Sequence, residues 1–534
     1  MSVNADADVL IVGYGPVGQF LSIQLARKGW SVAVVERWPD VYPLPRAVHF
    51  DDEVGRLLQW AGIRPDSSPV IEPHDDFYTW RNADMEDILR LDWRGQGRSG
   101  WPMANFFAQP ELEAELHKLV EAEPGVTLHR GWEVVDVRQD DTGVSVTARR
   151  TQADGDPQAR EERSFRARYV VGADGAKSFV RRAMGAQVHD LGFEYDWLIV
   201  DMIPDEPLTY DPPAWQWCNP EKPTTVVPGG PGRRRWEFMR MPHETVEEMN
   251  TPEYAWRRMA EWGLTPENST MERHAVYTFR AQWAQTWREG RVVLAGDAAH
   301  LMPPFAGQGM CAGLRDAANL TWRLDRVLSG ASGEELLATY GPERTSHVKY
   351  FITFSMGLGQ VICITDPEVA AQRDGGMQAA MADPTLAPPP EAPPHLAEGV
   401  LGFHPQAGFV SPQGRVSDGT TTGLLDDVVG YGWLVLSSRP ELAHALSPET
   451  ARWVEENGVI VRTVGDPGTD PGTDLADVDG TYRDWFAELE AEAVVVRPDF
   501  YVYDAVPLAG LDQTLGRLRE QLRGVPADTL AMSQ

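Results

Sequence analysis

The hydrophobic and polar positions of residues 1–185 follow two periods in turn. Apolar runs at 9–12 and 32–35 predict buried strands, and the spacing of apolar residues over 112–120 predicts a helix. Alternation of apolar and polar residues at 134–137 and 144–147 predicts two strands joined by a short turn. Strands that alternate with helices in this way are typical of a doubly wound α/β sheet.

The pattern changes over 186–276, where Trp, Pro and short strand-like pieces such as 197–202 and 235–239 replace the alternation of strands and helices. We expect an inserted, sheet-rich domain there. A buried strand returns at 292–296 and is followed by a long helix with an apolar stripe over 314–328. The first domain is therefore predicted to be discontinuous.

A proline-dense segment at 383–394 cannot sustain a helix or a sheet, so we expect it to be a linker. Beyond it the chain mixes strand and helix patterns again. Strand-like and helix-like runs lie at 433–437, 440–446, 458–462, 493–497 and 511–522. This pattern predicts a separate, small α/β domain.

A glycine motif lies at the turn after the first predicted strand. Gly13, Gly15 and Gly18 form a GxGxxG pattern between a strand and a helix. The first glycine permits the tight turn, the second lets the backbone approach a pyrophosphate, and the third lets the helix pack on the strand. Glu36, at the end of the next strand, would accept the ribose hydroxyls. The motif predicts a bound dinucleotide, either NAD or FAD.

The composition is that of a globular protein with an acidic surface. Of the 534 residues, 42% are hydrophobic and 24% are charged, and the length predicts two or three domains. The net charge of −31 argues against a nucleic-acid partner, because phosphate binding needs a basic face. We find no apolar run of about 18 residues and no signal-like start, so we expect a cytoplasmic protein without a membrane partner.

The three cysteines, Cys218, Cys311 and Cys363, are too far apart in the sequence to form a CxxC pair. Their spacing argues against dithiol redox chemistry and against a metal site. We expect them to be small core residues in a reducing compartment.

Two later motifs decide which dinucleotide binds. A predicted strand leads into a DGxxSxxR pattern that begins at Asp174, and another ends in Gly-Asp at Asp297, followed by a glycine-rich helix start at 307–309. In this order and spacing, the three motifs resemble those of the single-component, group A FAD-dependent aromatic hydroxylases. The resemblance covers residues 7–360.

The resemblance implies FAD as the cofactor. Asp297 would accept the ribityl hydroxyls, and the glycines at 307–309 would offer backbone N–H groups and a helix N-terminus to the pyrimidine edge of the flavin. Arg46 and Gln109 would contact the flavin side of the site. The predicted cofactor contacts are Gly13, Gly15, Pro16, Val17, Gly18, Glu36, Arg37, Arg46, Gln109, Val135, Asp174, Arg181, Gly296, Asp297, Pro304, Gly307, Gly309 and Met310.

Within this family the chain most resembles the branch of 3-(3-hydroxyphenyl)propanoate and phenol hydroxylases, which carry a C-terminal thioredoxin-like domain. The implied fold is α/β: a discontinuous, Rossmann-like FAD-binding domain, an inserted β-rich substrate domain and the thioredoxin-like α/β domain. Without a CxxC motif, the last domain has an expected structural or dimer-forming role. The corresponding ranges are 1–185 with 277–382, 186–276, a linker at 383–398, and 399–534.

The implied reaction uses NADH or NADPH and O₂ to hydroxylate a phenolic or polyketide-like aromatic through a flavin C4a-hydroperoxide. The chain has no second complete GxGxxG motif. The resemblance implies that the nicotinamide cofactor has no domain of its own and that the flavin itself meets it. A ring reacts faster as phenolate, yet a phenol with a pKa of about 10 is only ~0.1% ionised at pH 7. The reaction therefore calls for a base.

His49 is the candidate base, because it follows Arg46 and has an ordinary pKa near neutrality. Hydrogen bonding to the substrate without proton transfer, or simple packing, are the alternatives. Tyr277 could bond a substrate hydroxyl and Arg240 could pair with a substrate carboxylate, although either can be structural. His300 is interpreted as a hydrogen-bonding residue between loop and helix. Tryptophans of the insert, Trp215, Trp217 and Trp236, could line an aromatic pocket, and the alternative is that about half of them are ordinary core residues.

Two other functions fit the same motifs. A Baeyer–Villiger or epoxidising oxygenase would share the fold and would need no phenol-deprotonating base. A non-catalytic FAD carrier would bind the cofactor without turning over. The pattern favours the hydroxylase, with a small aromatic substrate and O₂ as its ligands, no metal, and a homodimer as the assembly that the family resemblance implies.

Overall fold

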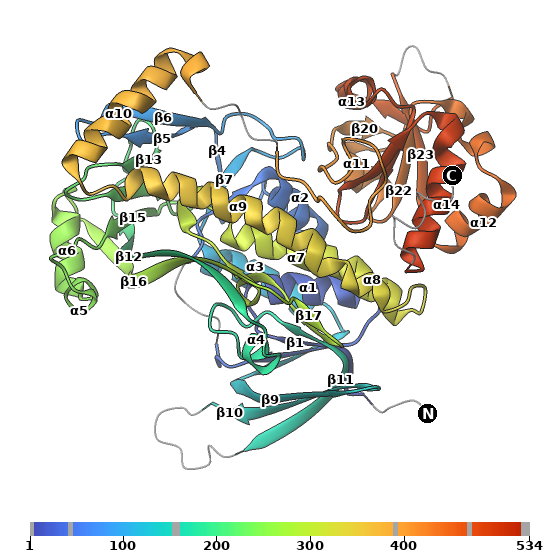
Figure 1. Cartoon of the computed structure of the whole chain (residues 1–534), viewed down its shortest axis with the longest axis horizontal. Helices are drawn as coiled ribbons and strands as arrows, with labels where there is room; N and C mark the ends of the chain where they lie inside the picture. The colour runs from blue at the N-terminus through green and yellow to red at the C-terminus, as the bar shows by residue number, and fades with distance from the viewer. Residues whose placement is uncertain (1–4, 41–45, 152–160, 388–392, 467–471, 525–534) are drawn as a thin grey trace.

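The computed structural model describes residues 5–40, 46–151, 161–387, 393–466 and 472–524. Their strands form two eight-stranded sheets, one seven-stranded sheet and one three-stranded sheet. In Figure 1 the seven-stranded sheet and its helices, in orange and red, lie beside α2, α7 and α8, while the other elements form the larger part of the molecule.

The first sheet carries the glycine-rich turn. Its strands are β1 (Ala7–Val12), β2 (Val32–Glu36), β8 (Val126–Arg130), β9 (Trp132–Asp140), β10 (Gly143–Arg150), β11 (Glu162–Gly172), β17 (Arg288–Glu289) and β18 (Val292–Leu294). Their order is β17-β18-β11-β1-β2-β8, with β10 joining β11 to β9. β1 pairs in parallel with β2 and with β11, as a doubly wound sheet requires. The hairpin predicted after 134–137 and the return to the sheet near 292 are both present.

Three long helices pack on this sheet or beside it: α1 (Pro16–Arg27), α3 (Gln109–Glu121) and α7 (Gly309–Leu328). The helices predicted at 112–120 and 314–328 are thus confirmed. The remaining helices of this part are α2 (Asp52–Ala61), α4 (Phe179–Ala183), α8 (Glu335–Ala338), α9 (Tyr340–Ile362) and α10 (Pro367–Ala382). In the part of the chain that the structure describes, no single helix meets the length and apolarity needed to cross a membrane, although the bent pair 335–362 and 367–382 does so together.

The second sheet has the strands β5 (Phe77–Arg81), β6 (Asp87–Asp92), β12 (Val188–Pro204), β13 (Ala214–Trp217), β14 (Thr224–Pro228), β15 (Arg234–Met239), β16 (Ser269–Ala284) and β19 (His300–Leu301). Their order is β19-β16-β12-β15-β14-β13-β5-β6. The sheet therefore extends beyond the range 186–276 in which we expected it. The reason is that β5 pairs in parallel with β13, a partner 130 residues and more away that no local pattern reveals.

Alternation along the strands separates two cores on the two faces of the second sheet. Trp197 and Ile199 belong to the core shared with the first sheet, whereas Leu198 and Val200 pack in an outer core with α5 (Val246–Met249) and α6 (Pro252–Ala260). The predicted pocket tryptophans all belong to this outer core or pack against it: Trp215, Trp217 and Trp236. The core alternative therefore holds for these tryptophans, because the strand alternation turns their side chains away from the first sheet.

The smallest sheet has three strands. It consists of β3 (His49–Asp51), β7 (Ala104–Phe107) and β4 (Ile71–His74), in the order β3-β7-β4. β7 pairs with both neighbours in antiparallel register, so that His49 lies opposite Phe106. This sheet positions the candidate base described below.

The C-terminal module, residues 393–524, contains β20 (Arg415–Ser417), β21 (Thr422–Leu424), β22 (Leu434–Ser437), β23 (Ile460–Gly465), β24 (Leu475–Asp477), β25 (Ala493–Val496) and β26 (Val502–Val506). Its helices are α11 (Leu425–Val429), α12 (Pro448–Glu456), α13 (Thr481–Leu489) and α14 (Leu511–Leu522). The predicted strands and the predicted last helix are present. The helix predicted at 440–446 is a short 3₁₀ helix, Pro440–Ala445. Of the predicted linker, 388–392 lie outside the described residues.

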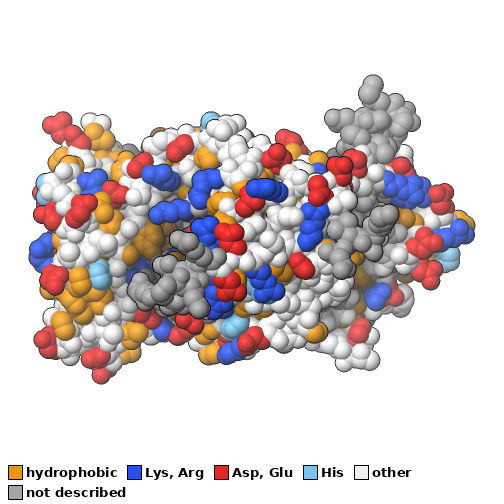
Figure 2. All heavy atoms as spheres, turned by 90° about the horizontal axis from the view of Figure 1, so that it is seen from below, with side chains coloured by type: hydrophobic (Ala, Val, Ile, Leu, Met, Phe, Trp, Pro, Cys, Tyr) orange, Lys and Arg blue, Asp and Glu red, His pale blue; other side chains and the backbone are white. Residues whose placement is uncertain are grey.

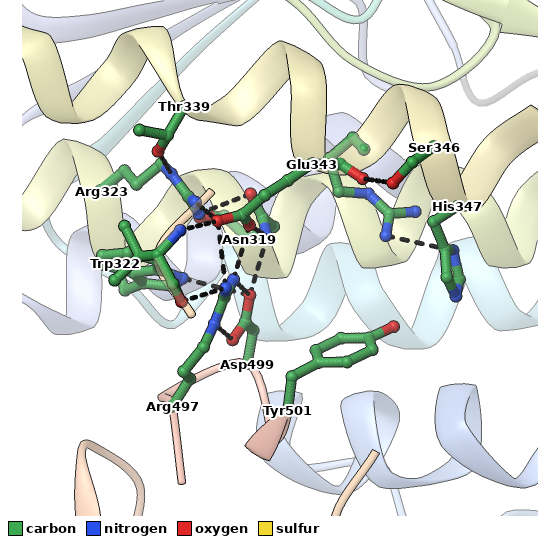
Figure 3. Close-up of polar contacts among 12 residues, drawn as sticks. Asn319, Trp322, Arg323, Thr339, Glu343, Ser346, His347, Arg497, Asp499 and Tyr501 are labelled. Carbon is green, nitrogen blue, oxygen red and sulfur yellow. Dashed lines mark hydrogen bonds and ion pairs between the residues drawn. The ribbon is translucent and has the colours of Figure 1, made fainter. Parts of the chain in front are cut away.

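Buried ion pairs fasten the C-terminal module to α7 and α9 (Figure 3). Arg497 donates to Glu343 at 2.8 Å and to Asp499 at 2.7 Å, and Asp499 accepts from Asn319 at 2.9 Å. Burial alone would raise the pKa of the Glu343 carboxyl, but Arg323 and Arg497 lower it to about 2. The charges at this contact therefore depend on one another, since each loses water that only its partners replace.

The outer surface mixes the two signs of charge. On the face shown in Figure 2, Lys and Arg side chains are interspersed with Asp and Glu side chains, and no continuous basic stripe crosses it.

A second pair of contacts allows a matched test of how strongly the module is held. Arg56 binds Asp426 through two hydrogen bonds of 2.6 and 2.8 Å, with both side chains at most 5% exposed, while Arg64 binds Asp427 with side chains 43% and 31% exposed. We expect R56A to lower the free energy of unfolding by about 3–5 kcal/mol, because it leaves a buried carboxylate unpaired. R64A should cost less than about 1 kcal/mol. Urea denaturation of both variants measures this, and equal losses would contradict the assignment of the buried pair.

Candidate functional site

The glycine-rich turn has the geometry of a phosphate cradle. Gly13 has a φ of +106°, and a Cβ there would lie 2.3 Å from the carbonyl oxygen of Ala173. A Cβ on Gly18 would lie 2.3 Å from the carbonyl oxygen of Gly13, whereas the Cβ position of Gly15 faces open space. α1 begins at Pro16 with no side-chain cap and no acidic residue in its first turn. Free N–H groups and the helix dipole therefore face that space, and both favour an anion.

Glu36 ties this turn to the end of β2. Its carboxylate accepts hydrogen bonds from the backbone N–H groups of Tyr14 and Trp38, both at 2.8 Å. Arg37 is exposed beside it, with its guanidinium 5.3 Å from the Trp38 ring centre. The acid lies where the sequence places it, next to the phosphate cradle.

Arg46 and Gln109, both predicted to contact the flavin, bind each other in the structure. The Gln109 side-chain oxygen accepts from the backbone N–H groups of Arg46 at 3.2 Å and Ala47 at 2.6 Å, and its amide donates to Glu113 at 2.6 Å. The Arg46 guanidinium lies 3.9 Å from the same Glu113 carboxylate. This arrangement fixes the segment that leads into β3.

The side chains of the DGxxSxxR motif mainly bind the chain itself. The Asp174 carboxylate accepts from the Ser178 hydroxyl and from the backbone N–H of Phe179 at 2.6 Å, and so caps α4. Arg181 donates to the carbonyl oxygens of Ala176 at 2.8 Å and Ala298 at 2.7 Å. One side chain thereby ties this motif to the Gly-Asp motif.

Asp297 is accessible to solvent at the Gly-Asp loop. The residue is exposed to solvent, yet it is surrounded so deeply by protein that burial raises the pKa of its carboxyl. Arg46 and Arg181 act in the opposite direction, which places all three side chains within electrostatic reach of one another. Two of the predicted residues, Arg46 and Arg181, thus act on the accessible carboxylate of a third, Asp297.

A buried carboxylate on α7 holds the Gly-Asp loop in place. Asp316 accepts from the backbone N–H of Gly296 at 2.9 Å and from Arg344 at 2.8 Å, and it pairs with His300 at 2.8 Å. His300 is also stacked on Trp287. The interpretation of His300 as a link between loop and helix is confirmed.

The glycine-rich helix start reaches His49. Gly307 has a φ of +64°, and a Cβ there would lie 2.5 Å from the Nδ1 atom of His49. The His49 ring stacks on Trp93 at 4.5 Å and meets the edge of Phe106 at 5.6 Å. Neither ring nitrogen meets the full geometry of a hydrogen bond among the described residues, although the Gly307 backbone lies close enough to oppose the effect of burial on the pKa of the ring. Burial lowers the pKa of His49 to about 4, so the ring is neutral at pH 7.

Arg315 clamps this corner of the structure. Its guanidinium donates to Asp51 and Glu53, each at 2.5 Å, and to Gln308 at 2.9 Å. The hydroxyl of Tyr501, from the C-terminal module, donates to Glu53 at 2.6 Å. The strand of His49, the loop of Gly307 and the C-terminal module are thus joined through one cation.

The other predicted residues have mixed surroundings. Tyr277 lies opposite Trp197 on β16, and the Arg273 guanidinium lies 4.6 Å from its ring centre. Arg240 follows β15 and is bound to Asp196 at 2.9 Å and to the Glu244 carbonyl oxygen at 3.1 Å. The guanidinium of Arg240 is therefore engaged within the chain. The half-buried positions are Val17, Val135, Pro304 and Met310, and Gly309 begins α7.

Sequence reasoning missed a buried charged cluster on the second sheet. Arg235 on β15 donates to Asp201 at 2.7 Å and to the carbonyl oxygen of Arg46 at 2.6 Å, and Glu237 lies on the same face of that strand. The available signal was the alternation of 235–238, where two charged residues alternate with Trp236 and Phe238. The predicted pocket was based on the aromatic residues of this strand and did not include its charged residues.

The fold and the residues at the motif loops fit FAD. The cradle at Gly15 suits a pyrophosphate, Glu36 lies beside it, and the accessible Asp297 carboxylate and the α7 N-terminus lie at the other motif loops. These features define a flavoprotein with a doubly wound nucleotide-binding sheet. The chain belongs to the FAD binding domain family, which it matches over residues 6–355, and residues 408–521 match the HcaD C-terminal domain family.

Relatives extend over nearly the whole chain. It is 39% identical to the "Probable NADH-specific resorcinol 4-hydroxylase" of Rhodococcus jostii, over 95% of this chain and 94% of that protein. It is 35% identical to a "3-(3-hydroxy-phenyl)propionate/3-hydroxycinnamic acid hydroxylase" of Mycolicibacterium gilvum, over 93% and 89%. The crystal structure of aklavinone-11 hydroxylase with FAD and aklavinone is similar, with a TM-score of 0.74, 25% identity, and coverage of 97% and 100%. The predicted membership of the FAD-dependent aromatic hydroxylases is confirmed.

The glycine geometry gives a direct test of cofactor binding. G18A should weaken FAD binding at least tenfold, because its Cβ would meet the Gly13 carbonyl oxygen and displace the turn. G375A is the matched control, since a Cβ at Gly375 in α10 meets nothing within 4 Å. Flavin fluorescence titration of the apoprotein measures both dissociation constants. Unchanged FAD affinity in G18A would contradict the role given to this turn.

Proposed function

We propose that this protein uses FAD, NADH and O₂ to hydroxylate a small phenol of the resorcinol type. The observation that carries the proposal is the convergence of the motif loops around the exposed Asp297, together with the neutral His49 ring that reaches Gly307 of the last motif loop. The relatives named above support the substrate class and the choice of NADH.

The residues that would hold FAD are those of the predicted set. The turn from Gly13 to Gly18 would bind the pyrophosphate, Glu36 the ribose and Asp297 the ribityl chain, with Gly307 and Gly309 at the ring. Bound FAD, once reduced by NADH, supplies the oxygen atom that is drawn from O₂. Arg46, Arg181 and Gln109 would hold the loops around it. The carboxylate of Asp174 is taken up by α4, so its contribution would be to shape the loop.

His49 is better suited to hydrogen bonding than to proton transfer. A conjugate acid with a pKa of about 4 provides a weak driving force for removing a phenol proton. A neutral imidazole can still accept or donate one hydrogen bond at each nitrogen, and neither nitrogen meets the full geometry of a hydrogen bond among the described residues. We therefore assign His49 to the wall of the site, as a partner for substrate or flavin. Tyr277 keeps its proposed contact with the substrate, whereas Arg240 is held by Asp196.

The finer points of the architecture belong to the same proposal. The division into an FAD-binding part, an inserted sheet and a C-terminal domain follows the ranges given above, with β5 and β6 added to the second sheet. A thioredoxin-like C-terminal domain is supported by parallel β22 and β23 beside antiparallel β25 and β26, with helices between them. We also propose a cytoplasmic location and a homodimer.

The function is tested with the FAD-loaded protein, resorcinol and 3-(3-hydroxyphenyl)propanoate. We expect resorcinol to stimulate oxidation of NADH more than of NADPH, and to yield one hydroxylated product per NADH. Chromatography of the product and an oxygen electrode provide the two measurements. An ester or epoxide product would indicate another oxygenation, and the absence of turnover with any phenol would indicate a carrier.

The role of His49 has its own test. We expect H49Q to reduce the yield of product per NADH about tenfold, because the glutamine amide cannot stack on Trp93 as the ring does and presents its donor and acceptor from a different position. The pH dependence of hydroxylation should keep its wild-type midpoint, since His49 does not titrate near neutrality. A midpoint that disappears in H49Q would restore His49 as the base.

A further inference from the structure

Glu237 is a buried carboxyl with no hydrogen bond among the described residues. It is 6% exposed, and its charged neighbour is Arg235, whose nitrogen lies 3.8 Å from the carboxylate oxygen. Arg235 cannot approach as a full partner, because it is bound to Asp201 at 2.7 and 3.1 Å. Its oxygens are not among the fully enclosed side-chain atoms that lack a partner, so a donor from outside the chain can reach them.

The position of Glu237 places it opposite the flavin motifs. Side chains two apart on a strand share a face, so Arg235, Glu237 and Met239 project from β15 in the same direction. On one side of Glu237, Arg235 donates to the carbonyl oxygen of Arg46. On the other side, Met239 lies in register with Trp197, which packs on Phe305 at a ring distance of 5.5 Å.

An aromatic wall connects Glu237 with His49. Tyr78 lies near enough that the charge of Glu237 adds to burial in raising the pKa of the Tyr78 hydroxyl. Tyr78 stacks on Trp93 at 4.6 Å, and Trp93 stacks on His49 at 4.5 Å. Flat aromatic faces pack on a phenol ring, and an acceptor such as Glu237 can bind its hydroxyl. These surroundings therefore suit a phenol.

We propose that Glu237 accepts the proton of the substrate's phenolic hydroxyl and that Arg235 and Asp201 position its carboxylate; this rests on the function proposed above. The O–H bond of the phenol breaks and an O–H bond forms on Glu237, which leaves a phenolate and a neutral acid. When the oxygenated ring regains its aromaticity, the C–H bond at the hydroxylated carbon breaks and its proton passes to water, while Glu237 returns its own proton to the phenolic oxygen. Water is the only further reactant in this exchange.

The charges around Glu237 suit a base that works at neutral pH. Burial raises the pKa of Glu237 to about 7, and Asp201 acts in the same direction, while Arg235 and Arg273 act against them. Asp201 is held between the two arginines, with Arg273 at 3.6 Å, and so is already neutralised by them. Near pH 7 such a carboxyl is ionised in about half of the molecules, and it is a strong enough base to take a proton from a phenol.

Three variants separate proton transfer from hydrogen bonding. E237Q keeps a hydrogen-bond acceptor but cannot take a proton, E237M lacks both properties, and E237D retains both on a shorter arm. E72Q is the matched control, because burial also raises the pKa of Glu72, which faces Arg234 on another sheet. FAD content and melting temperature establish that each variant is folded.

The first measurement is product formed per NADH, followed against pH and against substrate acidity. For E237Q with resorcinol at pH 7 we expect a loss of about 100-fold. The loss should shrink as the pH rises toward the pKa of resorcinol, and with ring-fluorinated resorcinols, whose hydroxyls ionise more readily. E237D should recover part of the yield, and E72Q should match the wild type. Wild-type yields in E237Q across this series would overturn the proposal.

The second measurement is equilibrium binding without NADH. Quenching of protein fluorescence gives dissociation constants for resorcinol and its dimethyl ether. The wild type and E237Q should prefer resorcinol at least tenfold, and E237M should lose that preference. A preference that persists in E237M would show that the hydroxyl binds elsewhere. If the wild type hydroxylates no phenol, the proposed function fails; if it does and the variants behave like it, only the role of Glu237 fails.

Discussion

The arrangement around the candidate site depends on the fully buried guanidinium of Arg315. Two carboxylates and an amide oxygen surround it, and they come from β3, α2 and the loop before α7. Burial of Arg315 opposes its charge, yet Asp51 and Glu53 raise its pKa well above the ordinary value. In a low-dielectric interior such a cluster has one arrangement of lowest energy, because each oxygen must keep its proton donor. This constraint fixes the distance between His49 and Gly307.

The same principle operates at the other motif loops. Asp316 fixes the Gly-Asp loop through the Gly296 backbone, and Arg181 ties that loop to the one that Asp174 shapes. Hydrogen bonds thus hold the loops around Asp297 in place before any ligand binds. Preorganisation of this kind lowers the cost of ordering a site when a cofactor binds. The glycines contribute the close approaches, and the buried ions contribute the rigidity.

Local chemistry made part of this structure predictable. Gly13 and Gly18 are needed for contacts within a few residues of the same turn, so the local sequence predicts them. The hydrogen bond between His300 and α7 also joins residues that are close in the sequence. The faces of the second sheet were not predictable from tryptophan content, because β12 and β15 are lined by buried side chains on both sides. The contact between Glu53 and Tyr501 spans 448 positions, and nothing near either residue marks it. Glu237 was missed because a charged residue in a strand is usually taken to face water.

The polar character of the contact shown in Figure 3 has a consequence for the modularity of the chain. An apolar interface can be exchanged for another of similar shape, since hydrophobic contact has no direction. Here a chain shortened at the proline-rich segment would retain Arg323, Asn319 and Glu343 without the groups that complete their shell. The C-terminal module is therefore a poor unit for recombination between relatives unless the incoming module carries counterparts of Arg497, Asp499 and Tyr501. The two parts of the chain are constrained to evolve as one protein.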